Sequence, residues 1–126
     1  MPRIRLRIVL EGGRLGPGKI DLMEHIAELG SISAAGRALG MSYRRAWALV
    51  EEANTLFENP LIEKYHGGKA GGGASLTPLG HTVVAHYREL ERTTLAATQS
   101  HLEALQAEID ATQTRQGNND SSANVP

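Results

Sequence analysis

The sequence predicts a mainly α-helical chain with a small β-hairpin and one long C-terminal helix. Apolar residues recur at helical spacing in three segments between residues 19 and 57, and two short strand-like segments surround a glycine-rich stretch at 66–74. The same helical spacing then continues from Val83 to Ile109. A length of 126 residues suits one domain with a single core. We expect a domain over residues 1–80, a helix over 78–113 and a disordered polar tail over 114–126.

The composition restricts the class of protein. The chain has no cysteine, so a disulfide framework, a thiolate nucleophile and a cysteine-based zinc site are not expected. No apolar run approaches the roughly 20 residues that cross a bilayer, and the first residues are too charged for a signal peptide. We expect a cytoplasmic protein without a membrane partner. Residues 1–50 hold eight basic and four acidic residues, whereas residues 81–126 hold three basic and six acidic ones, so an anionic partner would meet the first half.

The first elements follow from the spacing of apolar residues. The segment RIRLRIVLE alternates, which predicts a half-buried strand with Arg3, Arg5 and Arg7 on its outer face. These arginines either touch DNA or protect a strand edge from aggregation. GGRLGPG then predicts a loop, and apolar residues from Lys19 onward predict a first helix that ends at Gly30.

Two capped helices and a tight turn follow. Ser31 or Ser33 can cap a short helix that ends at Gly40, and Ser42 can cap a helix over residues 43–54. Small Ala35 and Gly36 would let these two helices approach closely. Two short helices joined by a glycine turn are the plan of a helix-turn-helix unit.

The second of these helices has an outward face suited to a DNA major groove. Helical phase puts Tyr43, Ala46, Trp47, Val50, Ala53 and Phe57 on the packed side, so Tyr43 and Trp47 are expected in the core rather than stacked on bases. Arg44 and Arg45 face outward, where they can reach guanine edges or phosphates. The alternative is that these two arginines only form a solvent-exposed surface of the helix. Glu51 and Glu52 come a turn later and would repel phosphate.

The glycine-rich stretch precedes a strand-like segment, ASLT, and Thr77 with Pro78 can start the last helix. A phosphate-binding loop of the Walker type does not fit, because Lys69 is followed by Ala70 and the earlier glycine position holds Glu63. No G-x-G-x-x-G pattern fits either. A nucleotide-binding protein therefore stays as an alternative that the spacing disfavours.

Two segments in order, LGSISAAGRALGMSYRRAW and GGKAGGGASLTPLG, resemble the DNA-binding domain of the ModE family of molybdate-responsive regulators. They resemble, more loosely, the winged domain of LysR-type regulators. The resemblance covers residues 4–95 and implies a winged helix-turn-helix whose wing is the glycine-rich segment. It further implies a transcriptional regulator that binds a palindromic operator in double-stranded DNA as a homodimer. No cofactor, metal or catalytic residue is expected. Full-length family members carry molybdate-binding domains, and we expect this chain to act as the DNA-binding part alone.

From the helix phase and the resemblance together, we expect nine residues to contact DNA: Ser31, Ser33, Arg37, Ser42, Tyr43, Arg44, Arg45, Lys64 and Lys69. Lys69 would lie at the tip of the wing.

The long C-terminal helix cannot bury its apolar stripe alone. It either packs on the domain or pairs with a second copy, and the residues expected at a dimer interface are Tyr87, Leu90, Leu102, Leu105 and Ile109. The alternative is an interaction module that pairs through this helix with a separate sensor protein. His81 and His86 are five residues apart, which is wrong for a helical metal pair, and neighbouring acids diverge on a helix. We therefore expect no enzyme.

Overall fold

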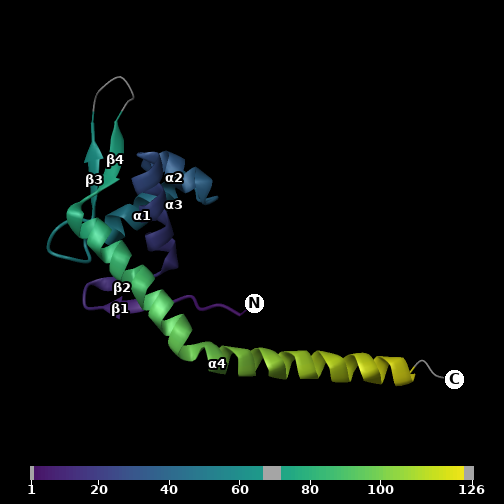
Figure 1. Cartoon of the computed structure of the whole chain (residues 1–126). Coiled ribbons are helices and arrows are strands. Elements are labelled where there is room, and N and C mark those ends of the chain that lie inside the picture. Colours follow the sequence, from purple (N-terminus) through teal and green to yellow (C-terminus); the bar gives the residue numbers. More distant parts are fainter. Residues whose placement is uncertain (1, 67–71, 124–126) are drawn as a thin grey trace. The chain divides into compact units, whose positions relative to one another are not determined.

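The computed structural model describes residues 2–66 and 72–123, which form four helices and two antiparallel hairpins (Figure 1). In chain order the elements are β1 (Ile8–Leu10), β2 (Gly13–Leu15), α1 (Pro17–Leu29), α2 (Ile32–Ala38), α3 (Tyr43–Asn54), β3 (Ile62–Tyr65), β4 (Gly73–Leu76) and α4 (Pro78–Ala123). The chain divides into two compact units, of which Arg5–Glu91 contains the first seven elements and the beginning of α4. The mainly helical class with a hairpin after the third helix is confirmed.

The β1–β2 hairpin differs from the expectation in two respects. Of the segment RIRLRIVLE, which we expected as one strand, only Ile8–Leu10 forms a strand. Residues 13–15, which we expected in a loop, form the second strand, and Ile8 pairs with Leu15 in an antiparallel register. The reason is that a lone strand would leave its backbone donors and acceptors unpaired. Leu15 is also 5% exposed and contributes to the core. The predicted alternation is confirmed at Arg5 and Arg7, which are exposed on either side of half-buried Leu6.

Helices α1, α2 and α3 form the predicted helix-turn-helix arrangement. α2 ends in a turn at Gly40, whose φ of 71° lies in the left-handed region that favours glycine. A Cβ on Gly36 would lie 2.9 Å from the Cβ of Ala46, so the two helices approach as closely as the small residues predicted. Four residues of α3 pack into the core: Ala46, Leu49, Val50 and Ala53.

Asn54, the last residue of α3, connects the helix-turn-helix to the β3–β4 hairpin. Its Oδ1 accepts hydrogen bonds from the backbone N–H groups of Leu61 and Ile62, both at 2.9 Å, and its Nδ2 donates to the Ile62 carbonyl at 3.1 Å. The hairpin pairs Ile62 with Leu76 at its base. This side chain therefore determines where β3 starts relative to α3.

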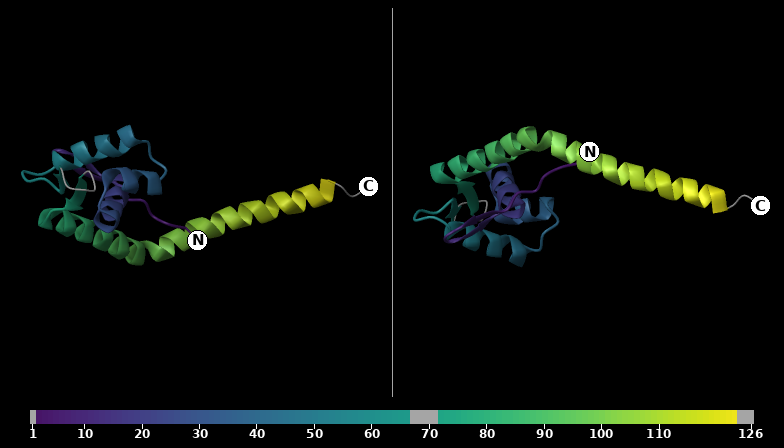
Figure 2. Two further views of the ribbon diagram at one scale, coloured as in Figure 1. Left: turned by 90° about the horizontal axis from the view of Figure 1, so that it is seen from above. Right: turned by 90° about the horizontal axis from the view of Figure 1, so that it is seen from below.

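The start of α4 packs on α1. Thr77 caps α4 as predicted, because its Oγ1 accepts a hydrogen bond of 2.9 Å from the Gly80 amide. Both views of Figure 2 show the first turns of α4 (green) on one side of α1, with α2 and α3 on the other. Tyr87 is completely buried there, and its hydroxyl donates a 2.6 Å hydrogen bond to the Leu6 carbonyl. Burial raises the pKa of Tyr87, and the nearby Glu91 carboxylate raises it further.

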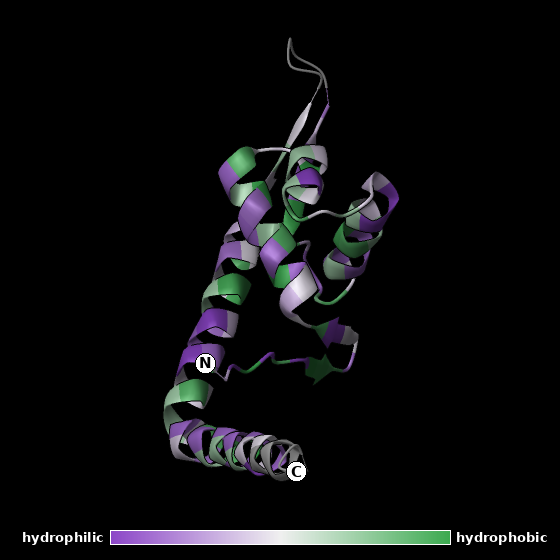
Figure 3. Ribbon diagram, turned by 90° about the vertical axis from the view of Figure 1, so that its right-hand side faces the viewer, coloured by the Kyte–Doolittle hydropathy of each residue, from purple (hydrophilic) through white to green (hydrophobic). Residues whose placement is uncertain are grey.

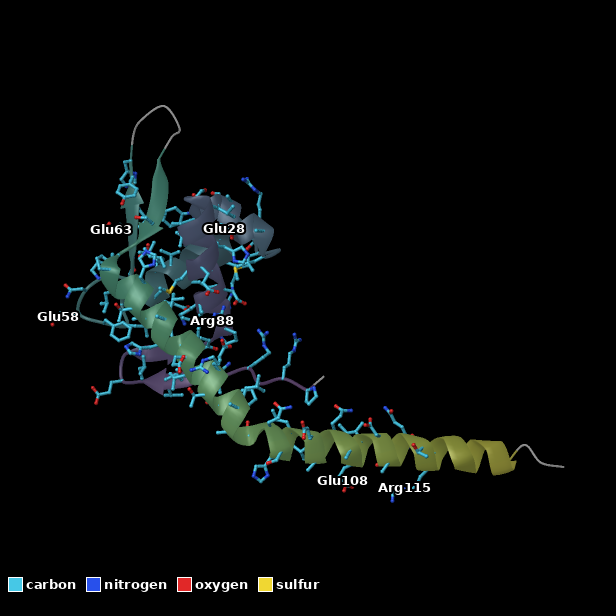
Figure 4. All side chains as sticks on the ribbon, viewed as in Figure 1. Glu28, Glu58, Glu63, Arg88, Glu108 and Arg115 are labelled. Carbon is cyan, nitrogen blue, oxygen red and sulfur yellow. The ribbon has the colours of Figure 1, made fainter. Side chains whose placement is uncertain are left out.

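Arg88 holds α4 to α1 by charge. Its guanidinium donates to Asp21 at 2.8 Å and to both carboxylate oxygens of Glu24 on α1, and to Glu91 at 2.7 Å on α4 (Figure 4 labels Arg88). The hydrogen bond to Glu24 is the main cause that raises the pKa of Arg88 above its ordinary value. Figure 3 shows hydrophobic and hydrophilic residues interspersed along α4.

Two expectations about α4 are wrong. The chain from residue 114 to Ala123 is helical rather than disordered, and residues 124–126 lie outside the described part. Absence of an apolar stripe shows that a segment has no buried face, but a helix that is already nucleated extends at little cost. The second error is Tyr87, which we expected at a dimer interface and which is a core residue. No described helix is long and apolar enough to cross a membrane.

Candidate nucleic-acid interface

The two serines at the helix starts are N-caps. Ser31 Oγ accepts a 3.2 Å hydrogen bond from the Ala34 amide, and Ser42 Oγ accepts a 3.1 Å bond from the Arg45 amide. A capping oxygen satisfies one of the free amides of the first turn, and its own O–H remains able to donate. Ser42 therefore both starts α3 and leaves a donor at the end of the helix that faces solvent.

The first turn of α3 presents cations to solvent. Arg44 and Arg45 are exposed, and neither makes an ion pair with any residue in the described ranges. Tyr43 is 63% exposed, so the expectation that it belongs to the core is wrong, although Trp47 is partly buried as expected. Tyr43 is the first residue of α3 and lies at the end of the surface that packs on the core, a position that the helix phase alone did not reveal. Small Ala48 is exposed one turn later.

The two acids of α3 are each paired with a lysine from a different element. The Nζ of Lys64 on β3 lies 2.9 Å from Glu51 Oε1, and the Nζ of Lys19 on α1 lies 3.1 Å from Glu52 Oε2. Both carboxylates are more than half exposed, so each pair contributes little to stability. Their effect is electrostatic: the repulsion that these acids would exert on a phosphate is offset by a cation on each flank of the helix.

A groove of about 180 Å³ separates the starts of α2 and α3 from the β3–β4 hairpin. It brings together four of the expected DNA-binding residues: Ser31, Ser33, Tyr43 and Lys64. Tyr65 of β3 and the adjacent His66 line it as well, and no spacing signal in the sequence predicted either residue. Lys64 Nζ lies 4.8 Å from the centre of the Trp47 ring, an arrangement that attracts a cation to the ring face. The Trp47 Nε1 is buried without a hydrogen-bond acceptor among the described residues.

Other expected residues lie apart from this groove. Arg37 is exposed in the last turn of α2, and Arg45 lines a different hollow on the other flank of α3. Lys69 lies outside the described residues. On α4, Leu90, Leu105 and Ile109 are 48%, 64% and 51% exposed, and Leu102 is partly buried.

Comparison with known proteins agrees with this geometry. Residues 18–81, which run from α1 into the start of α4, match the family model of the bacterial regulatory helix-turn-helix protein, lysR family. The molybdenum-pterin-binding protein MopB of Rhodobacter capsulatus is 45% identical over 86 residues, which are 67% of this chain and 32% of that protein.

Two further relatives are named as ModE proteins. The DNA-binding transcriptional dual regulator ModE of Escherichia coli strain K12 is 45% identical over 71 residues, covering 56% of this chain and 27% of the relative. The molybdenum transport protein ModE of Herbaspirillum seropedicae is 46% identical over 82 residues, 65% of this chain and 30% of the relative. The chain thus spans about a third or less of the length of these relatives. With the family model matching every element from α1 to the start of α4, the chain belongs to the lysR family of bacterial regulatory helix-turn-helix proteins.

Proposed function

We propose that the chain regulates transcription by binding a specific sequence of double-stranded DNA, with the first turns of α3 in the major groove. The observation that carries the proposal is the two exposed arginines at the start of a capped helix beside a β-hairpin, neither of which forms an ion pair with a described residue. The chain's membership of a family of regulators supports it. Arginine donates to guanine and to phosphate, and a small residue such as Ala48 allows close approach to bases. No enzymatic activity is part of the proposal.

Selection of bound duplexes from a random pool tests this function. The purified chain should enrich one sequence, and its affinity for that duplex should fall steeply with salt as counterions are released. Binding that shows neither sequence preference nor salt dependence would contradict the proposal.

A homodimer on a palindromic operator is the second part of the proposal. Leu105 and Ile109 of α4 are more than half exposed, and covering a large aliphatic side chain stabilises a complex by about 1.5 to 3 kcal/mol. On a palindromic operator, two copies would each insert one α3 helix into successive major grooves, which lie about 34 Å apart on one face of DNA. The selected operator should then contain two inverted half-sites separated by about one helical turn.

Sedimentation of Leu105→Asp against Ala107→Asp tests the pairing surface. Both substitutions add one acid at an exposed position of α4, but Ala107 lies on a different side of the helix from Leu105. We expect Leu105→Asp to dissociate the dimer and Ala107→Asp to leave it intact. A monomeric wild type would contradict the proposal.

We also propose that the regulated genes serve the uptake or use of molybdenum, because the relatives carry names that refer to molybdenum. We further propose that a second protein, which contacts the exposed apolar residues of α4, makes DNA binding respond to molybdate. Genome-wide mapping of bound DNA, with and without added molybdate, tests both statements. Bound sites unrelated to molybdenum genes would contradict the first, and occupancy that ignores molybdate would contradict the second.

A further inference from the structure

A second and larger hollow, of about 500 Å³, lies on the other flank of α3. At about 100° per residue, Arg45 points about 200° away from Tyr43 and Trp47, which line the groove beside the β3–β4 hairpin. Arg44 and Ala48 lie between the two flanks. The charged residues that line this basic hollow come from the segment before β1 and from β2, α1 and α3: Arg5, Arg7, Arg14, Lys19, Arg45 and Glu52.

The charge in the basic hollow is poorly balanced. The charge of Lys19 is balanced, because its Nζ forms the ion pair with Glu52 at 3.1 Å and also donates to the Arg14 carbonyl at 2.9 Å. The other four cations are arginines on the surface, and none forms an ion pair with any residue that the structure describes. Cations gathered in one concave surface repel one another and attract an anion.

Protection of a strand edge does not explain this arrangement. Such protection needs charges only along the outer face of a strand, and Arg5 and Arg7 precede β1 rather than lie on it. Arg14 comes from β2 and Arg45 from α3, and both face the same hollow. The first turn of α1 also borders it, with no acidic residue in that turn and no side-chain cap, so no group of the helix competes with an external anion.

We propose that the basic hollow binds backbone phosphates of DNA along the edge of the major groove opposite the β3–β4 hairpin. The inference rests on the proposed function, because it requires α3 to enter that groove. A helix with its side chains is about 10 to 12 Å across and the major groove is about 12 Å wide, so a helix in the groove has one phosphate backbone on each flank. The hairpin side meets one backbone and the basic hollow meets the other. Arginine suits this role because its planar group binds a phosphate through two hydrogen bonds.

The test compares three single substitutions that each remove one positive charge: Arg7→Gln, Arg14→Gln and, as a matched control, Arg115→Gln. Arg115, labelled in Figure 4, is an exposed arginine of α4 far along the chain from the basic hollow. Affinity for the selected operator duplex and for a scrambled duplex is measured over a series of salt concentrations. Each hollow variant should reduce the slope of log affinity against log salt by about 0.9 per protomer. The ratio of affinities for the two duplexes should stay the same, because phosphate contacts do not read sequence.

Several outcomes overturn the inference. If wild type binds the operator but the slopes of Arg7→Gln and Arg14→Gln equal that of Arg115→Gln, the hollow makes no phosphate contact and the proposed function still stands. A wild type without salt-dependent binding overturns the proposed function, and this inference with it. Thermal unfolding separates misfolding from lost contacts, and Arg14→Lys, which keeps the charge, should restore the slope. Saturable binding of inorganic phosphate that Arg14→Gln abolishes, with an unchanged DNA slope, would assign the hollow to a free anion instead.

Discussion

Gly36→Ala perturbs the packing of α2 against α3, and the structure allows its cost to be worked out. The added Cβ would lie 2.9 Å from the Cβ of Ala46, whereas carbon atoms in contact are about 3.5 to 4.0 Å apart. The helices must therefore separate by roughly half an ångström or more, and overpacking of this kind costs about 1 to 3 kcal/mol. Alanine stabilises the interior of a helix relative to glycine by about 1 kcal/mol, so the net loss of stability should lie between about 0 and 2 kcal/mol.

A double-mutant cycle isolates the contact from helix propensity. Chemical denaturation gives the free energy of unfolding of Gly36→Ala, Ala46→Gly and the double variant. Ala46→Gly removes the Cβ that the new methyl would meet, so the double variant should be more stable than the sum of the single effects by about 1 kcal/mol or more. Gly18→Ala is the matched control, because a Cβ there has no atom within 4 Å. Additive effects, or a Gly36→Ala variant as stable as this control, would refute the close approach of the two helices.

Three further substitutions address what holds the helix-turn-helix unit together. Asn54→Ala leaves the amides of Leu61 and Ile62 without their acceptor and should lower the free energy of unfolding by about 2 kcal/mol in urea titration; a loss below about 0.5 kcal/mol would count against the connection. Arg88→Gln leaves three carboxylates facing one another; because Arg88 is 36% exposed, we expect a discounted loss of about 1 to 2 kcal/mol, and no loss beyond that of Arg115→Gln would show the cluster to be passive. Tyr87→Phe removes the bond to the Leu6 carbonyl. Because burial raises the folded pKa of Tyr87 above its unfolded value, its stabilising effect is complete below about pH 10 and declines as pH rises through the folded pKa, so unfolding titrations should show a steeper alkaline loss for wild type than for Tyr87→Phe.

Most of the fold follows from local signals in the sequence. Ser42 before a periodic apolar run, Gly40 in the turn and Thr77 before Pro78 are each local, and each has the predicted role. The prediction failed where the outcome depends on a distant partner. Residues 13–15 become a strand because they pair with β1. Tyr87 is buried, and its hydroxyl donates to the carbonyl of Leu6, 81 residues earlier in the chain. No periodicity within a segment contains that information.

The candidate site shows the same division. Arg44 and Arg45 could be predicted from helix phase, since an outward face is a property of one helix. The pairing of Glu51 with Lys64 and of Glu52 with Lys19 joins residues from different elements, and it turns acids that would repel phosphate into members of neutral pairs. Convergence of Arg14 and Arg45 on the basic hollow likewise appears only in three dimensions.

The exposed start of α3 is proposed to read the DNA sequence, and the substitution Arg44→Ala tests this role. Arg44 lies between the two flanks of the helix and makes no ion pair in the described chain, so its removal should not disturb the fold. We predict that the difference in binding free energy between the selected operator and a scrambled duplex falls by about 1 to 3 kcal/mol, the value of one base contact. Arg115→Ala should leave that difference unchanged. Equal losses on both duplexes, or no loss on either, would contradict the claim.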